Sequence, residues 1–197
     1  RIRAGDASEQ FDFEDAYRFG PVLGELDVYL LAEGTHLRNY ARLGAHPAVK
    51  DRVGGIAFAV WAPNARRVSV VGDFNAWDGR HAQMRRRVDS GLWEIFVPEI
   101  GEGAVYKYEI IGQGGELLPL KADPFGTRAE MRPSTASIVA RSDRFVWNDE
   151  AHRAHRRARD PRRSPMAAYE VHLSSWRRRP DGGFLSYDEI ADALIPY

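Results

Sequence analysis

The chain has 197 residues, with 28 Lys or Arg against 28 Asp or Glu, 44% apolar residues and no Cys, which fits one domain or one domain and part of another. A net charge of zero and the lack of any apolar run near ~20 residues argue against nucleic acid and membranes as partners. The lack of Cys excludes disulfides, thiolate metal sites and thiol nucleophiles, and it fits a reducing compartment.

Residues 1–47 are interpreted as a linker and a short helical lead-in. Residues 1–20 are polar with scattered aromatic residues, as in an arm that docks on another surface. Residues 21–47 hold two groups of Leu and Tyr that are separated by glycines. This spacing predicts a short helix, a turn and a second short segment.

Short runs rich in Val, Ile and aromatic residues follow, separated by Gly, Pro, Asn and Asp. They occupy residues 56–61, 68–74, 92–97, 105–111, 116–120 and 136–139. In the first run apolar residues alternate, as in a strand with one buried face. Six such runs predict a mainly β fold, an immunoglobulin-like antiparallel β-sandwich over residues 48–140. Gln113 to Glu116 has the composition of a hairpin turn.

Residues 141–165 are basic and predict a solvated linker helix around residues 151–159. Contact with nucleic acid is not expected, because the predicted helix lacks interleaved aromatic residues and the whole chain is neutral. His152 and His155 stand three residues apart, as a metal pair on a helix could, but no neighbouring residue completes a site. We therefore expect no metal and no cofactor.

Residues 166–197 predict the start of an α/β domain, with a boundary near Pro165. Residues 166–173 form an apolar run that predicts a strand, and a loop follows. Ser186 and Glu189 have the spacing of a capping box, so a helix is expected over residues 186–194. Strand, loop and helix make the opening βα unit of such a domain.

The motifs of nucleotide-binding loops, of the Ser hydrolase elbow and of zinc proteases are absent from the sequence. Asp73 and Asp78 flank a turn and are interpreted as capping residues rather than as a catalytic pair. Trp61 and Trp93 lie within β runs and are expected in the core.

The segment Gly72-Asp73-Phe74-Asn75-Ala76-Trp77-Asp78-Gly79 places an aromatic residue in a turn directly after a strand. An exposed Trp77 would offer a flat apolar face on which a sugar ring can stack. Asn75 could bind sugar hydroxyls or shape the turn. Packing in the core is the other interpretation of Trp77, and the residues alone leave both open.

These residues carry a resemblance to a known family. Residues 58–65 (FAVWAPNA) followed by residues 72–77 (GDFNAW) resemble the family 48 carbohydrate-binding module, which precedes the catalytic barrel in α-glucan-active enzymes of glycoside hydrolase family 13. Residues 169–176 (YEVHLSSW) resemble the first barrel strand of its branching-enzyme branch. Further agreement comes from residues 17–24, 43–47 and 120–125.

The resemblance implies a part of a bacterial, cytoplasmic glycogen branching enzyme. Such an enzyme cleaves an α-1,4-glucan and transfers the chain to a 6-hydroxyl. The family's nucleophile Asp, acid/base Glu and transition-state Asp belong to later barrel strands, so we expect this chain to be an inactive fragment with a truncated TIM-type barrel. The alternative is a non-catalytic glycan-binding or barrel-positioning module of an isoamylase-type debranching or trehalose-forming relative.

The resemblance also implies a glycan pocket, of which this chain has about half. Trp77 and Lys107 match the first two family positions, with Asn75 beside them. Leu117 and Leu118 stand where a second Trp is found, and residues 134–136 stand where an Asn is found. Strand alternation places Lys107 on the solvent face, opposite Tyr106 and Tyr108. The expected partners are an α-glucan (glycogen, amylose or maltooligosaccharides), bound weakly, and the rest of the barrel.

Overall fold

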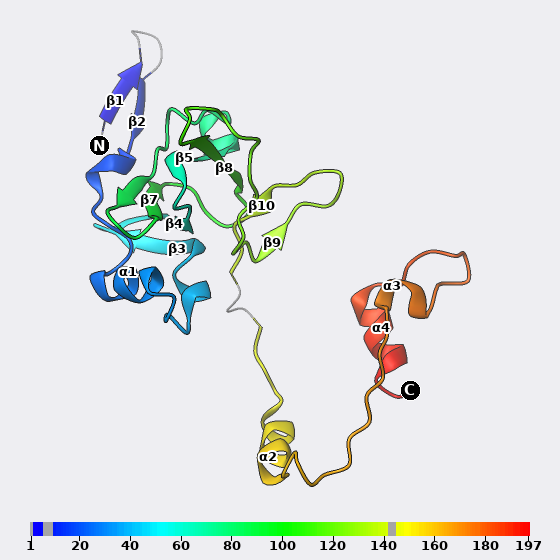
Figure 1. The fold of residues 1–197 in the computed structure, drawn as a ribbon. Coiled ribbons are helices and arrows are strands. Elements are labelled where there is room, and N and C mark those ends of the chain that lie inside the picture. The colour runs from blue at the N-terminus through cyan, green and yellow to red at the C-terminus, as the bar shows by residue number, and fades with distance from the viewer. Residues whose placement is uncertain (1, 6–9, 142–144) are drawn as a thin grey trace. The chain divides into compact units, whose positions relative to one another are not determined.

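The computed structural model describes residues 2–5, 10–141 and 145–197, and it divides the chain into two compact units, Arg1–Val146 and Trp147–Tyr197 (Figure 1). Each unit is described by itself.

The first unit is built on two four-stranded antiparallel sheets (Figure 1). One sheet has the strand order β3-β4-β7-β6, and the other has the order β5-β8-β10-β9. The bounds are β3 Gly44–Lys50, β4 Val53–Trp61, β5 Ala65–Gly72, β6 Arg85–Arg87, β7 Leu92–Pro98, β8 Val105–Gly112, β9 Arg128–Ala129 and β10 Ser137–Ile138. The predicted antiparallel β architecture is confirmed. Its first strand begins at Gly44, inside the stretch that was expected to precede the sandwich.

The predicted alternation explains the core. Ile56, Phe58 and Val60 of β4 are buried together with Trp93 of β7 and Tyr106 of β8. The three β4 residues stand at every second position of the strand, because successive strand side chains point to opposite faces of the sheet. The rings of Phe58 and Tyr106 meet edge to face, with centroids 5.0 Å apart.

Two expectations for this unit are wrong. Trp61 was expected in the core, yet its side chain is 58% exposed, because it ends β4 on the face opposite Val60. Residues 116–120 form no strand; Leu117 makes only an isolated bridge to Ile111. Gly112 N–H donates to the Glu116 carbonyl at 2.9 Å, so the chain does turn back between these two residues, as predicted.

The lead-in forms a third layer on the outer face of the first sheet. It contains the 3-10 turns η1 (Ala16–Arg18) and η2 (Asn39–Ala41) and the helix α1 (Glu25–Ala32), which confirms the predicted short helix and second segment. Leu23 and Leu43 are buried against Ala59 of β4 and Leu92 of β7. The expected arm contains a hairpin, β1 (Ile2–Gly5) with β2 (Gln10–Phe13), and its residues 1 and 6–9 lie outside the described residues.

The buried carboxylate of Glu94 attaches the lead-in to the first sheet. Glu94 of β7 has no exposed surface, and its Oε2 accepts hydrogen bonds from the backbone N–H groups of Val22 and Leu23 at 3.0 and 2.7 Å. Its Oε1 lies 3.1 Å from Nη1 of Arg87, whose Nη2 donates to Glu25. The carboxylate is therefore both paired and hydrogen-bonded, which is the condition for tolerating a buried charge.

The second unit contains three helices among its residues: α2 (Glu150–Ala158), α3 (Leu173–Trp176) and α4 (Tyr187–Leu194). The predicted linker helix corresponds to α2. Ser186 Oγ accepts from Glu189 N–H, and the Glu189 carboxylate accepts from Ser186 N–H at 2.7 Å, so the predicted capping box is confirmed. The Trp176 indole N–H donates to the Tyr169 hydroxyl at 2.9 Å.

The predicted strand over residues 166–173 does not form. These residues have no regular structure up to α3, and Met166 is 90% exposed. The described part of the chain offers no neighbouring strand to this segment. An apolar run alone is not enough for a strand, because strand backbone groups need partners across the sheet.

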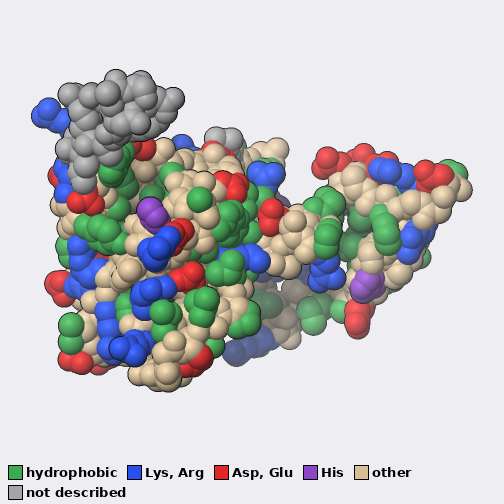
Figure 2. All heavy atoms as spheres, turned by 90° about the horizontal axis from the view of Figure 1, so that it is seen from above, with side chains coloured by type: hydrophobic (Ala, Val, Ile, Leu, Met, Phe, Trp, Pro, Cys, Tyr) green, Lys and Arg blue, Asp and Glu red, His purple; other side chains and the backbone are tan. Residues whose placement is uncertain are grey.

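Acidic and basic side chains are interspersed over the visible surface (Figure 2), as the neutral composition leads one to expect. Within the described residues, no helix is long and apolar enough to cross a membrane.

Replacing Glu94 by Ala should lower the free energy of unfolding by about 3 kcal/mol, because Arg87 and two backbone N–H groups lose a buried partner. Urea unfolding measures this change. Glu94→Gln should cost less, since the amide oxygen still accepts a hydrogen bond. Exposed Glu116→Ala is the control and should stay within about 0.5 kcal/mol of the unsubstituted protein. If Glu94→Ala behaves like that control, Glu94 does not fasten the layer.

The Glu189 carboxyl should titrate well below its ordinary pKa of 4.5. The Arg179 guanidinium, then the Ser186 N–H and hydroxyl groups, lower the pKa of Glu189 to about 2. A lowered folded-state pKa means that this contribution to stability is full above pH 4.5 and is lost as the pH falls toward 2. Carbon NMR of the carboxyl group gives the midpoint. A midpoint near 4.5 would contradict the bonding described here.

Candidate functional site

The turn after β5 is held by the side chain of Asn75. Residues Asp73–Asn75 form the 3-10 turn η3. Asn75 Oδ1 accepts from Gly72 N–H at 3.0 Å, and its Nδ2 donates to the Val70 carbonyl at 2.9 Å. Both ends of the amide thus bind the backbone of β5. Of the two roles considered from the sequence, these contacts correspond to shaping the turn.

Trp77 is held in a strained backbone conformation. Ala76 and Trp77 both have left-handed φ values, 53° and 59°. Each such residue costs on the order of 1–3 kcal/mol, and surrounding contacts must compensate. Trp77 N–H donates to the Gly72 carbonyl at 2.9 Å, and the indole N–H donates to Asp73 Oδ1 at 2.7 Å. The indole is half-buried and anchored at its nitrogen edge.

Charged groups fix the end of this turn. Asp78 accepts hydrogen bonds from the Arg80 guanidinium and from Arg80 N–H. These bonds, led by the guanidinium, hold the pKa of Asp78 well below its usual range. Asp78 therefore acts as a turn anchor in the ionised state, in agreement with the capping role expected from the sequence.

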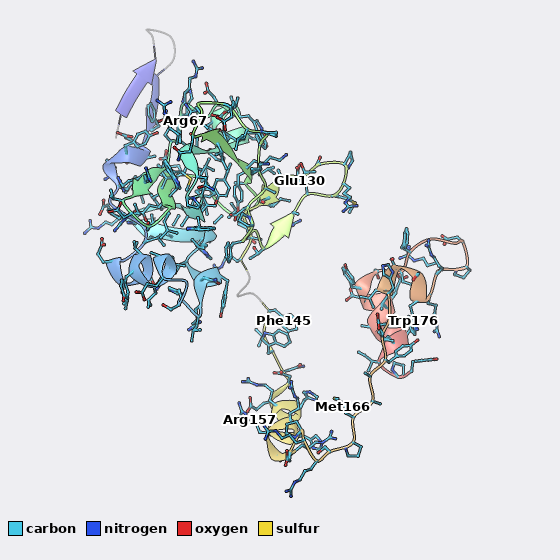
Figure 3. All side chains as sticks on the ribbon, in the orientation of Figure 1. Arg67, Glu130, Phe145, Arg157, Met166 and Trp176 are labelled. Atoms are coloured by element: carbon cyan, nitrogen blue, oxygen red, sulfur yellow. The ribbon has the colours of Figure 1, made fainter. Side chains whose placement is uncertain are left out.

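The turn folds over the outward face of β8. A Cβ atom placed on Gly79 would lie 1.9 Å from Oε1 of Glu109, so the backbone there lies directly on that side chain. Glu109 also accepts from the Arg67 guanidinium of β5, and Arg67 is labelled in Figure 3. The segment that carries Trp77 therefore covers the same face to which Glu109 points.

Lys107 points to this face as well. Tyr106 and Tyr108 are buried in the core, whereas Lys107 lies between them on the opposite side of β8, as the alternation predicts. Its cross-strand partner on β5 is Val71, next to the glycine that binds Trp77 N–H. Lys107 Nζ donates to the Thr135 hydroxyl at 2.7 Å.

Thr135 was not singled out from the sequence as a contact of Lys107. It lies 28 residues later in the chain, two residues before Ser137, which pairs with Tyr106 across β10 and β8. The only sequence signal for it was its place in the segment 134–136, where the resembling family has an Asn. Lys107 is therefore flanked by the Trp77 turn on one side and by Thr135 on the other.

Leu117 is one of the two leucines, Leu117 and Leu118, that were expected from the resemblance to stand where the family has a second Trp. It is 64% exposed and bridges Ile111, which shares the outward side of β8 with Lys107. The outward face of β8 therefore carries an exposed aliphatic side chain at this end.

The carboxylate of Asp123 binds two tyrosines on the core side of β8, opposite Lys107. Asp123 Oδ2 accepts from the Tyr106 hydroxyl at 2.6 Å and from the Tyr108 hydroxyl at 3.0 Å, and its Oδ1 accepts from Phe125 N–H. Burial, followed by the nearby Asp123 charge, raises the pKa of both tyrosines well above the usual value. Both phenol groups therefore stay protonated and donate to Asp123. These bonds hold β8 in place on the side opposite Lys107.

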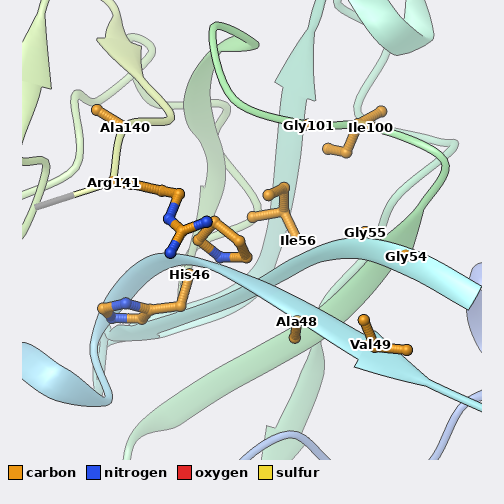
Figure 4. A pocket seen from close by; sticks show the side chains of 11 residues that line it. His46, Ala48, Val49, Gly54, Gly55, Ile56, Ile100, Gly101, Ala140 and Arg141 are labelled. Atoms are coloured by element: carbon orange, nitrogen blue, oxygen red, sulfur yellow. The ribbon is translucent and has the colours of Figure 1, made fainter. Parts of the chain in front are cut away.

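A separate hollow of about 630 Å³ lies beside β3 and β4 (Figure 4). His46 and Arg141 are its two ionisable lining residues. The His46 ring bonds to the Leu43 carbonyl at 2.9 Å. The described residues contain no group of three or more His, Cys, Asp or Glu that could hold a metal ion.

Residues 42–126 match carbohydrate-binding module family 48 (isoamylase N-terminal domain). The 1,4-alpha-glucan branching enzyme GlgB of Mesorhizobium japonicum is 56% identical over 197 residues, which cover all of this chain and 27% of that enzyme. The GlgB of Rubrobacter xylanophilus is 60% identical over 186 residues, 94% of this chain and 26% of that enzyme. The chain thus matches the N-terminal part of these relatives and spans about a quarter of their length.

Among solved structures, the chain is similar to the PulA-G680L mutant from Klebsiella pneumoniae, with 27% identity over 52% of this chain and 10% of that one. The TM-score of this match is 0.41.

Asn75→Ala should lower the free energy of unfolding by about 1–2 kcal/mol, because Gly72 N–H and the Val70 carbonyl lose their partner. Urea unfolding measures this loss. Gln113→Ala, in an exposed turn of the same unit, is the matched control and should be nearly neutral. Equal midpoints for the two variants would mean that the Asn75 amide does not hold the turn.

Proposed function

We propose that the chain serves a 1,4-alpha-glucan branching enzyme by holding an α-glucan chain, because residues 42–126 match the family 48 carbohydrate-binding module and the whole chain matches the N-terminal part of such enzymes. The glucan lies along the turn after β5 and beside the outward face of β8, where it contacts Trp77 and Lys107 while Asn75 holds the turn.

The observation that carries the proposal is the placement of Lys107. Its ammonium group is oriented by Thr135, and it stands on the face that the Trp77 turn covers. The axial C–H groups of a glucose ring form an apolar patch that stacks on the indole plane. Lys107 Nζ donates to a ring hydroxyl, and Thr135 accepts from one.

Each residue has a distinct role in this arrangement. The indole N–H is already bonded to Asp73, so Trp77 contributes its ring face rather than a hydrogen bond. Asn75 acts through the backbone, by holding the turn that presents Trp77. One aromatic face and one ammonium group make a small site, so binding of glycogen, amylose or maltooligosaccharides is weak, with a dissociation constant in the millimolar range.

For the whole enzyme we propose the reaction implied by its relatives. An α-1,4-glucan is cleaved, its end is held as a glucanyl ester, and the chain is transferred to a 6-hydroxyl. Retaining chemistry of this kind needs two carboxylates about 5 Å apart across a cleft. We assign that chemistry to the barrel and propose that the first unit concentrates the glucan there and positions the barrel. The second unit supplies the beginning of that barrel.

A role in a debranching or trehalose-forming enzyme is not favoured, since the relatives that match the whole chain at 55–57% identity are named branching enzymes. A cytoplasmic location is proposed on the absence of Cys and the bacterial relatives.

Trp77→Ala should abolish binding of maltoheptaose at this site, because the stacking face is lost, while the free energy of unfolding falls by only about 1 kcal/mol for the lost bond to Asp73. NMR titration followed at residues of β8 around Lys107 measures the affinity of this site. Trp147→Ala in the second unit is the control and should leave the affinity unchanged. Unchanged affinity in Trp77→Ala would remove Trp77 from the site, and a loss of 3–5 kcal/mol would identify it as a core residue.

The same titration tests the other positions. Lys107→Ala should weaken binding about fivefold, through the loss of one hydrogen bond. Leu117→Trp should tighten binding about tenfold, because it supplies the missing second aromatic face.

A further inference from the structure

Trp61 stands at the rim of a pocket on the opposite sheet. The pocket has a volume of about 380 Å³ and lies between the lead-in and the end of β4. The Trp61 side chain is 58% exposed. A Cβ atom on Gly91 would lie 3.0 Å from its indole nitrogen and 2.8 Å from Pro63 Cβ, so one edge of the indole rests on a tight turn. The ring is thus held in place although much of it is open to solvent.

The walls of the pocket are apolar. Leu43 and Leu92, which belong to the buried cluster under the lead-in, line it together with Leu31 and Phe125. Its volume and its mostly apolar lining, with a few polar groups, are those of a small-molecule site.

The polar groups of the lining are available for a ligand. Among the described residues, the Glu33 carboxylate and the Asn39 side-chain amide make no hydrogen bond or ion pair. They offer three acceptor oxygens and one donor NH2 group beside the face of Trp61. This combination suits a molecule with several hydroxyl groups and an apolar side.

The charge of the lining disfavours an anion. Glu33 caps the C-terminal end of α1, where the helix dipole is negative. His36 is the one basic residue of the lining, and both of its ring nitrogens are occupied: Nδ1 accepts from Arg38 N–H at 3.2 Å, and Nε2 lies 3.0 Å from Asp27 Oδ1. A phosphate or carboxylate ligand would lie near the Glu33 carboxylate and the negative end of the α1 dipole. Among the lining residues it would find no basic side chain that is free to bind it.

We propose that this pocket is a second carbohydrate subsite, in which a glucosyl unit stacks on Trp61 while Glu33 and Asn39 bind its hydroxyls. That the sugar belongs to an α-glucan rests on the proposed function; that the pocket takes a neutral sugar rests on its own lining. Trp61 ends a strand of the first sheet, whereas Trp77 follows a strand of the second sheet, so the two sites bind independently.

The indole N–H signals of the five Trp residues separate the two sites in one experiment. The full 197-residue chain is titrated with maltoheptaose, and the signals are assigned with single Trp→Phe variants. The signals of Trp61 and Trp77 should both shift with increasing sugar. Trp77→Ala should leave the Trp61 shift unchanged. Asn39→Ala should weaken binding at Trp61 about fivefold and leave binding at Trp77 unchanged.

Other outcomes are decisive. A shift at Trp77 without one at Trp61 overturns the second subsite and leaves the proposed function standing. A shift at Trp61 without one at Trp77 supports the second subsite and overturns the site proposed above. A shift at Trp61 with choline but not with maltoheptaose would make it a cation pocket and overturn the proposal. A parallel shift of the exposed Trp147 would indicate unspecific contact with indoles and also overturn it.

Discussion

The buried carboxylate of Glu94 is the constraint on which the arrangement of the first unit depends. A charge without exposed surface is tolerated only if it is paired and its remaining oxygen is hydrogen-bonded. Arg87 supplies the pair, and two backbone N–H groups of the lead-in supply the bonds. The outer face of the first sheet is therefore closed by residues 19–43 at one fixed register. Without that layer, Ala59 and Leu92 of the sheet would lie open to water.

Closing one outer face leaves the two sheets with different surfaces. The covered sheet keeps a pocket at the edge of its cover, beside Trp61. On the other sheet the Trp77 turn covers part of the outward face, and Lys107 stands beside this turn. Trp61 and Trp77 are held in a similar way. One edge of the Trp61 ring rests on the backbone at Gly91, one edge of the Trp77 ring is bonded to the Asp73 carboxylate, and the rest of each ring is partly accessible. Such rigid aromatic faces suit sugar rings, because little side-chain freedom is lost on binding.

Local sequence was sufficient wherever the determining contacts are close in the chain. Alternation placed Ile56, Phe58 and Val60 in the core and Lys107 outside, because strand side chains have a period of two. The capping box of Ser186 and Glu189 needs only four consecutive residues. The turn at Asn75 likewise uses partners three and five residues away. The family motifs in these segments also indicated a glucan-related function.

Tertiary structure decided what depends on distant partners. Trp61 looked like a core residue, yet burial depends on what covers a side chain, and the lead-in stops short of it. Residues 166–173 looked like a strand, but a strand needs a neighbour for its backbone groups, and no described residue provides one. Thr135 reached Lys107 only through the pairing of β8 with β10. The sequence by itself determined on which face of a strand each side chain lies, because the alternation of side chains is a local property of the chain. The tertiary structure decided which residues each face contacts, because those contacts join residues that are far apart in the sequence.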